Sequence, residues 1–220
     1  MFIPKAYAVE DWAEIVRMVR EVRAGDLVSV DSDGAPISTL MPCIWSADPE
    51  NPDELGILHV HIARANKQWK SIKPGAPGLA IFNGPQGYVS ASNYAEKKTT
   101  GRVVSTWNYT SVHLHGELEV IDDPDYVRNI VMELTRFHES DRVEPWDPAD
   151  IDIDYLATEL QGIVAITMKV TRVEAKAKMS QNHTEANRQN IIADFRASHR
   201  SEDHLVADVM QEILDKKRSI

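Results

Sequence analysis

The segment Arg102–Val120, RVVSTWNYTSVHLHGELEV, most constrains the fold, because its second half alternates strictly between apolar and polar residues. Val112, Leu114 and Leu118 fall on one face, and the histidines and glutamates between them fall on the other. Successive side chains of a strand point to opposite faces, so the pattern predicts a strand with one face on a core. The preceding residues Ser105–Tyr109 combine hydroxyls, an amide and two aromatic rings. That mixture suits a polar ligand with a flat ring, and it equally suits an ordinary strand.

The rest of the chain predicts an α+β protein. Few helices separate the strands, which argues against repeated βαβ units and favours an antiparallel sheet, closed or partly closed into a barrel that hides its edges. Helical spacing or helix-start signals predict helices over residues 9–23, 123–138, 151–160, 185–197 and 201–217. Further strands are predicted over 26–30, 37–45, 58–63 and 163–173, with a hairpin of 79–82 and 88–90 across Asn83–Gly87.

Composition excludes several classes of partner. The formal charge of -10 opposes a broad nucleic-acid-binding face, since phosphate contacts need clustered lysine and arginine. No apolar run approaches the roughly 20 residues of a membrane helix, and the first residues lack the apolar core of a signal peptide. The single Cys43 lies in an apolar run and cannot form an internal disulfide. We therefore expect a buried thiol and a cytoplasmic protein with no membrane partner.

Two His-x-His pairs, His59/His61 and His113/His115, each project from one face of a predicted strand. If the two strands were neighbours, four imidazoles could meet, and imidazole suits zinc, copper, iron or nickel. No acid completes a metal pattern beside the first pair, and the positive Arg64 that follows it would oppose a cation. The alternative interpretation is hydrogen-bonded strand histidines, and we predict no metal site.

Two segments have chemistry that suits a phosphate group. Arg64, Asn66 and Lys70 follow the end of a predicted strand and offer a guanidinium, an amide and an ammonium. A short helix beginning near Asn66 would add backbone N–H groups. Lys176–Gln181, expected to be a basic loop, repeats the same chemistry. A solvated basic surface is the alternative, but together with the Thr-Trp-Asn strand these segments favour a phosphorylated, flat aromatic cofactor. Rossmann, P-loop and nucleophile motifs are absent from the sequence.

Several short motifs occur in the order typical of one family. They are Met1-Phe2-Ile3-Pro4-Lys5, His61-Ile62-Ala63-Arg64-Ala65-Asn66 with Trp69, Gly84-Pro85-Gln86, Tyr88-Val89-Ser90, Thr106-Trp107-Asn108-Tyr109, His113-x-His115-Gly116 and Lys178-Met179-Ser180-Gln181-Asn182. Over about its first 185 residues the chain thus resembles the PaiB family of FMN-binding negative transcriptional regulators with a split β-barrel fold.

The resemblance implies a homodimer of split barrels, each with an N-terminal helix and C-terminal helices, and FMN sites at the subunit interface. Residues 1–182 would form the FMN-binding domain, and 183–220 a C-terminal helical extension. Arg64 and Asn66 would bind phosphate, while Lys178, Ser180 and Gln181 could come from the other subunit. The full set of expected cofactor-binding residues is His61, Arg64, Asn66, Thr106, Trp107, Asn108, Lys178, Ser180 and Gln181.

The function that the resemblance implies is an FMN-dependent oxidoreductase or a negative transcriptional regulator. The chain departs from the family at Asn93 and Ala177, where the family usually has tryptophan. The alternatives are a regulator without flavin and a haem-binding or haem-degrading split-barrel protein. In the haem-binding alternative, the axial ligands of the haem iron would come from His59, His61, His113, His115 or His183. Direct DNA binding is not expected, since no helix-turn-helix with a basic recognition helix is evident.

Overall fold

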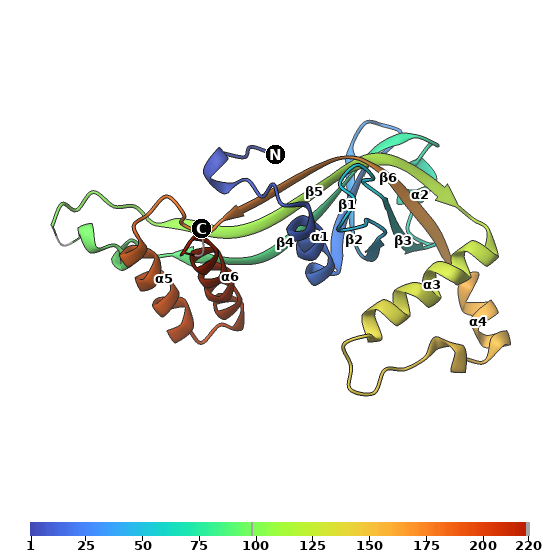
Figure 1. The fold of residues 1–220 in the computed structure, drawn as a ribbon. Coiled ribbons are helices and arrows are strands. Elements are labelled where there is room, and N and C mark those ends of the chain that lie inside the picture. The colour runs from blue at the N-terminus through green and yellow to red at the C-terminus, as the bar shows by residue number, and fades with distance from the viewer. Residues whose placement is uncertain (98, 219–220) are drawn as a thin grey trace. The chain divides into compact units, whose positions relative to one another are not determined.

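The computed structural model describes residues 1–97 and 99–218 and has the predicted α+β architecture (Figure 1). Its strands are β1 (Ala24–Val30), β2 (Pro36–Trp45), β3 (Ile57–Ala63), β4 (Ala76–Val89), β5 (Thr106–Ile121) and β6 (Ile163–Lys178). Its α-helices are α1 (Trp12–Val22), α2 (Gln68–Ser71), α3 (Pro124–Glu139), α4 (Ile153–Leu160), α5 (Glu185–Ala197) and α6 (Ser201–Arg218). Four 3-10 helices are η1 (Lys5–Tyr7), η2 (Ala91–Asn93), η3 (Ala95–Lys97) and η4 (Pro148–Asp150).

The strands form a closed barrel in the order β1-β2-β3-β6-β5-β4. β1 pairs antiparallel with β2 and β4, and β3 pairs antiparallel with β2 and β6. Closure leaves no strand with an unpaired edge along the barrel, which removes the backbone groups that would otherwise template aggregation. The predicted antiparallel barrel is confirmed.

The chain divides into two compact units. Unit 1 comprises Met1–Glu10, Asn83–Ser111 and Ala175–Ile220, and unit 2 comprises Asp11–Phe82 and Val112–Glu174. β4, β5 and β6 each contribute residues to both units. The boundary expected after residue 182 stays a prediction.

In unit 2 the alternation of β5 is confirmed. Leu114 and Leu118 have no exposed surface, whereas Glu117 and Glu119 are exposed. The start of α3 follows its predicted cap, because the Asp123 carboxylate accepts the backbone N–H of the third helical residue. The helix then buries apolar side chains at helical spacing, namely Val127, Ile130 and Leu134.

Unit 1 is built on its own apolar core. α5 and α6 lie side by side (Figure 1) and bury Ile191, Phe195 and Met210 in one cluster with Val89 of β4 and Met179. The hydroxyl of Thr184 accepts a backbone N–H at the start of α5, so the predicted helix 185–197 begins and ends where expected.

Two predictions about strands are wrong. No hairpin forms across Asn83–Gly87, because β4 is one strand of 14 residues. Tight hairpin turns need positive φ, and neither Gly84 nor Gly87 adopts it. Gly87 instead permits close packing, since a Cβ there would lie 2.9 Å from the Phe195 ring. The basic loop expected from Lys176 begins only after Lys178, where β6 ends.

The lone cysteine is buried, as predicted. Burial raises the pKa of the Cys43 thiol to about 12, which makes it a poor nucleophile. No helix in the described part of the chain has the length and apolarity needed to span a membrane.

Candidate functional site

Unit 1 contains a cavity of about 360 Å³, which we call the Lys178 pocket. Its walls come from η1, from the segment before β5 that includes the Glu96 carboxylate, from the start of β5, and from the end of β6 with the chain that follows it. The lining residues used below are Tyr94, Arg102, Val104, Thr106, Lys178, Ser180 and His183.

Lys178 places a cation in the wall of this pocket. Its Nζ donates to the Thr106 hydroxyl at 2.5 Å and to the Trp107 carbonyl at 2.6 Å. Burial lowers the pKa of Lys178, and the neighbouring Lys176 lowers it further. Both acceptors are neutral, so the ammonium has no carboxylate among these hydrogen bonds. An anionic ligand would therefore be attracted to it.

Ser180 lies in the left-handed region with φ of 59°, although it is not glycine, and only 2% of it is exposed. Its hydroxyl donates to the Asn108 side-chain oxygen at 3.0 Å. Asn108 is fully buried, so it positions Ser180 and cannot itself reach a ligand at the surface. Sparsely populated backbone conformations cluster at functional sites, where surrounding contacts hold them.

Tyr94 and His183 stack in the same pocket, with ring centroids 4.5 Å apart and planes 23° apart. Tyr94 is 3% exposed, and its buried hydroxyl has no hydrogen-bond partner among the described residues. An unpaired buried hydroxyl costs about 1–3 kcal/mol, so it points to a partner that binds here. Burial lowers the pKa of His183, which favours the neutral imidazole at pH 7.

Arg64 and Asn66 lie in unit 2, just after β3, and each already has partners. The Arg64 guanidinium binds the Asp122 carboxylate through two hydrogen bonds of 2.8 and 2.5 Å. Asn66 donates to the Thr39 hydroxyl at 3.1 Å. Arg64 and Asp122 also line a second cavity, of about 570 Å³, against α3 and α4. A phosphate at Arg64 would have to exchange with Asp122.

The predicted cofactor residues thus fall into two groups. His61, Arg64 and Asn66 belong to unit 2, and the other predicted residues belong to unit 1. Within unit 1, Lys178 contacts Thr106 and Trp107, and Ser180 contacts Asn108. The Gln181 side chain folds back, accepting from the Met179 N–H at 2.7 Å and donating to the Ala177 carbonyl at 2.6 Å.

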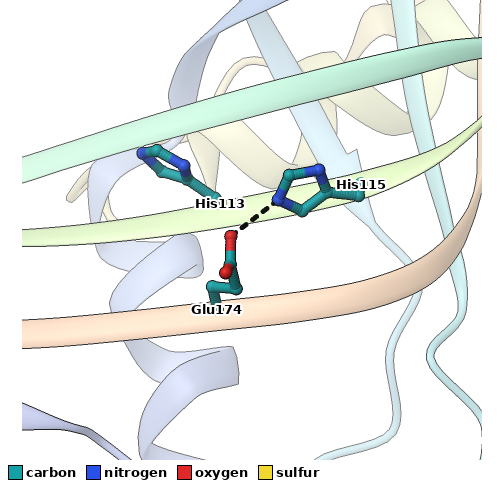
Figure 2. Close-up of side chains that lie close together, drawn as sticks. All are labelled: His113, His115 and Glu174. Atoms are coloured by element: carbon teal, nitrogen blue, oxygen red, sulfur yellow. Dashed lines mark hydrogen bonds and ion pairs between the residues drawn. The ribbon is translucent and has the colours of Figure 1, made fainter. Parts of the chain in front are cut away.

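The two histidine pairs do not come together, because β6 lies between β3 and β5 in the barrel. His59 is hydrogen-bonded through Nδ1 to the Tyr126 hydroxyl at 3.0 Å. His61 keeps a buried Nδ1 without a partner among the described residues, and burial lowers its pKa. His113 and His115 instead face Glu174 of β6 (Figure 2).

Sequence reasoning missed two parts of these sites. Glu174 lies 59 residues after His115, so only the pairing of β5 with β6 brings the two together. Arg102 lines the Lys178 pocket from an irregular segment, where no periodic pattern marks a functional side. The sequence did draw attention to Tyr94, because it is the last residue of the segment Ser90–Tyr94, in which the chain differs from the PaiB pattern.

Residues 1–172 match the model of the family described as "Putative FMN-binding domain". The chain belongs to this family. It is also 29% identical over 219 residues to "Protease synthase and sporulation protein PAI 2" of Bacillus subtilis, a match that covers 99% of this chain and 100% of that relative. The resemblance to the PaiB family is therefore confirmed.

Solved structures share the fold of this FMN-binding-domain chain. The flavocytochrome Anf3 from Azotobacter vinelandii matches with a TM-score of 0.55 and 15% identity, over 77% of this chain and 68% of that one. The FAD and haem binding protein from Mycobacterium smegmatis matches with a TM-score of 0.52 and 18% identity, over 75% of this chain and 70% of that one. The barrel is of the split β-barrel type.

The two positions at which this member departs from the PaiB pattern lie outside the lining of the Lys178 pocket. Ala177 is 6% exposed and belongs to the unit 1 core with residues of α5 and α6, so a tryptophan there would have to displace them. Asn93 donates to the Asp194 carboxylate of α5 at 3.0 Å. Both departures are thus accommodated by the C-terminal helices.

Proposed function

We propose that the protein binds FMN at the Lys178 pocket and acts as a flavin-dependent oxidoreductase. The observation that carries the proposal is a partly desolvated Lys178 ammonium in the same pocket as a buried Tyr94 hydroxyl that has no partner among the described residues, in a chain of an FMN-binding-domain family. An anionic ligand with polar edges would satisfy both groups.

The residues present fit such a cofactor. Lys178 and Arg102 would face the polar edge of the flavin ring, which gains negative charge when the ring is reduced, while Thr106 and Ser180 offer hydroxyls to the same edge. FMN, when bound, supplies hydride and electron transfer, and the protein supplies position and electrostatics. The pocket volume of about 360 Å³ lies near the lower end of the 300–1,000 Å³ typical of ligand sites. A second copy of the chain would enlarge the enclosure.

The test compares FMN binding by the wild-type chain and by Lys178→Met, which keeps the apolar stem and removes the charge. We expect the wild type to quench flavin fluorescence, and we expect affinity to fall about 10- to 100-fold in the variant, the worth of a charged hydrogen bond. Lys73→Met, at an exposed lysine of unit 2, is the matched control and should bind as the wild type does. A colourless protein whose melting temperature does not respond to saturating FMN would refute the proposal.

We propose that the working form is a homodimer. Several large apolar side chains of unit 1 are exposed, including Phe2 at 83%, Val104 at 80% and Trp107 at 44%. Val104 lines the Lys178 pocket, so a copy of the chain that covers it would also close the cofactor site. Sedimentation equilibrium should give twice the mass of 24.7 kDa, and Val104→Asp should yield monomers with weaker FMN binding. A wild-type monomer that binds FMN fully would overturn this part.

In such a dimer Arg64 and Asn66 would bind the FMN phosphate, with Asp122 giving up the Arg64 guanidinium. Asp122→Asn removes the competing charge at Arg64. If Arg64 binds phosphate, the variant should hold FMN more tightly, and Asp122→Asn should have no such effect on riboflavin, which lacks the phosphate. Equal effects on the two ligands would exclude Arg64 as a phosphate ligand.

A haem-binding role is the second candidate, because His183 lines the same pocket with a lowered pKa and neutral imidazole is the form that ligates iron. Addition of haemin should then give a Soret band that His183→Ala abolishes.

A transcriptional role stays a prediction. α6 buries Val206, Met210 and Leu214 in the unit 1 core and opens with Glu202 and Asp203, so we do not propose it as a DNA-recognition helix.

A further inference from the structure

Three potential metal ligands converge in unit 2, and none of them is among the residues assigned to flavin. His113 and His115 are two positions apart on β5, so both project to the same side of the strand. Glu174 projects from β6 toward them (Figure 2). One ligand atom from each of the three side chains lies within 4.8 Å of the other two.

The three side chains of this His–His–Glu cluster are close together and partly buried. His115 Nε2 lies 2.8 Å from a Glu174 carboxylate oxygen, and the rings of His113 and His115 are 6.3 Å apart between centroids. The side chains of His115 and Glu174 are 25% and 17% exposed. His115 and Glu174 are therefore partly buried, and each keeps some surface exposed to solvent.

We propose that the cluster binds a divalent first-row transition metal ion of the zinc and iron class. Two imidazoles and one carboxylate form the ligand set that such borderline cations prefer, whereas magnesium and calcium favour oxygen ligands alone. Three protein ligands leave at least one coordination position for water, as in sites where the metal does chemistry.

Arg172 is one cation that competes with the ion for these ligands. Its guanidinium donates to His115 Nδ1 at 3.0 Å and pairs with Glu174 at 2.8 Å. The hydrogen bond to Nδ1 leaves the ring proton on Nε2, the nitrogen that would bind the metal. When the ion binds, that proton leaves Nε2 and Nδ1 becomes protonated, so Arg172 has to turn away. Its side chain is 55% exposed and can do so.

The other histidine pair provides an internal control. His59 and His61 have the same spacing on β3, yet they form no such cluster with an acid among the described residues. His59 is hydrogen-bonded to the Tyr126 hydroxyl. Substitution of His59 thus changes a strand histidine without touching the proposed ligands.

The experiment titrates untagged, chelator-treated, full-length protein with Zn²⁺ by calorimetry and with Co²⁺ by visible absorption. We expect one site per chain and Co²⁺ bands typical of nitrogen and oxygen ligands. Glu174→Gln and His113→Ala should each weaken binding by more than about 100-fold, since loss of an outer-shell partner alone costs about 10- to 100-fold. His59→Ala should bind as the wild type does.

Arg172→Gln separates a metal site from a plain ion-pair network. It keeps all three ligands and removes one competing charge, so it should bind Zn²⁺ about tenfold more tightly than the wild type. Failure of both the wild type and Arg172→Gln to bind either ion would overturn the proposal. So would Zn²⁺ binding that Glu174→Gln leaves unchanged in a variant with a wild-type melting temperature. Neither result depends on whether the protein binds flavin.

Discussion

At the scale of single residues, two tyrosine hydroxyls in this molecule have opposite environments. The Tyr94 hydroxyl is buried without a partner among the described residues, whereas the Tyr126 hydroxyl is hydrogen-bonded to His59 at 3.0 Å. Removal of a hydroxyl that has no partner relieves a desolvation cost, and removal of one that is paired loses a bond. Substitution of each tyrosine by phenylalanine therefore distinguishes a hydroxyl that stabilises the fold from one that binds a ligand.

We expect Tyr94→Phe to raise the free energy of unfolding of the ligand-free protein by about 1 kcal/mol and to weaken FMN binding about five- to tenfold. Tyr126→Phe, the matched control, should lower the unfolding free energy by about 1 kcal/mol and leave FMN affinity unchanged. Urea denaturation and fluorescence titration measure the two quantities. If Tyr94→Phe bound FMN as the wild type does, its hydroxyl would have no role in the site.

At the scale of elements, local signals predict most of the fold. The alternation of β5 and the caps of α3 and α5 are local properties, and all three elements form as expected. Both predicted strands, 79–82 and 88–90, fall largely within β4, but the turn predicted between them is wrong. A Gly-Pro-rich segment is typical of a turn, and the sequence does not reveal that Phe195 of α5 packs closely over Gly87. The end of β6 was missed because Lys176 is buried, and its Nζ finds the Tyr109 hydroxyl at 2.6 Å.

The candidate sites were less predictable from sequence patterns than the elements. The grouping of Lys178 with Thr106 followed from resemblance to a family, and the structure adds the contact between them. The approach of Glu174 to His115 depends on which strands are neighbours in the barrel, and periodicity carries no information about strand order.

α6 supplies the prediction at this scale. Met210 is fully buried in the unit 1 core, while Leu205 on the same helix is 54% exposed. Met210→Ala should lower the free energy of unfolding by about 2–5 kcal/mol, because it leaves a cavity among packed side chains. Leu205→Ala should change it by less than about 0.5 kcal/mol. Chemical denaturation followed by circular dichroism measures both. Equal losses would mean that α6 is not packed as described.

At the scale of the whole molecule, burial of imidazoles links folding to pH. Burial is the main cause that lowers the pKa of His59, His61, His138 and His183, so each prefers to be neutral in the native state. Glu133 and Glu96 oppose the shift at His59 and His183, respectively, whereas Arg23 reinforces it at His138. These histidines belong to both units, so the effect concerns the entire chain.

In the unfolded chain each histidine has a pKa of about 6.5. Between that value and the lower native pKa, the unfolded state binds more protons than the native state, so stability rises with pH. The contribution is fully present above about pH 6.5 and is lost as the pH falls through the native pKa values.

We expect the free energy of unfolding to be constant between about pH 7 and 8 and to fall steadily between about pH 6.5 and 5, as measured by urea titration at each pH. His138→Gln should reduce that slope. Carboxylates with a lowered pKa, such as Asp122 paired with Arg64, lose their contribution to the free energy of unfolding only below about pH 4. They therefore do not affect the slope between about pH 5 and 6.5. A protein that is as stable at pH 5 as at pH 7.5 would show that these imidazoles are not buried in the native state.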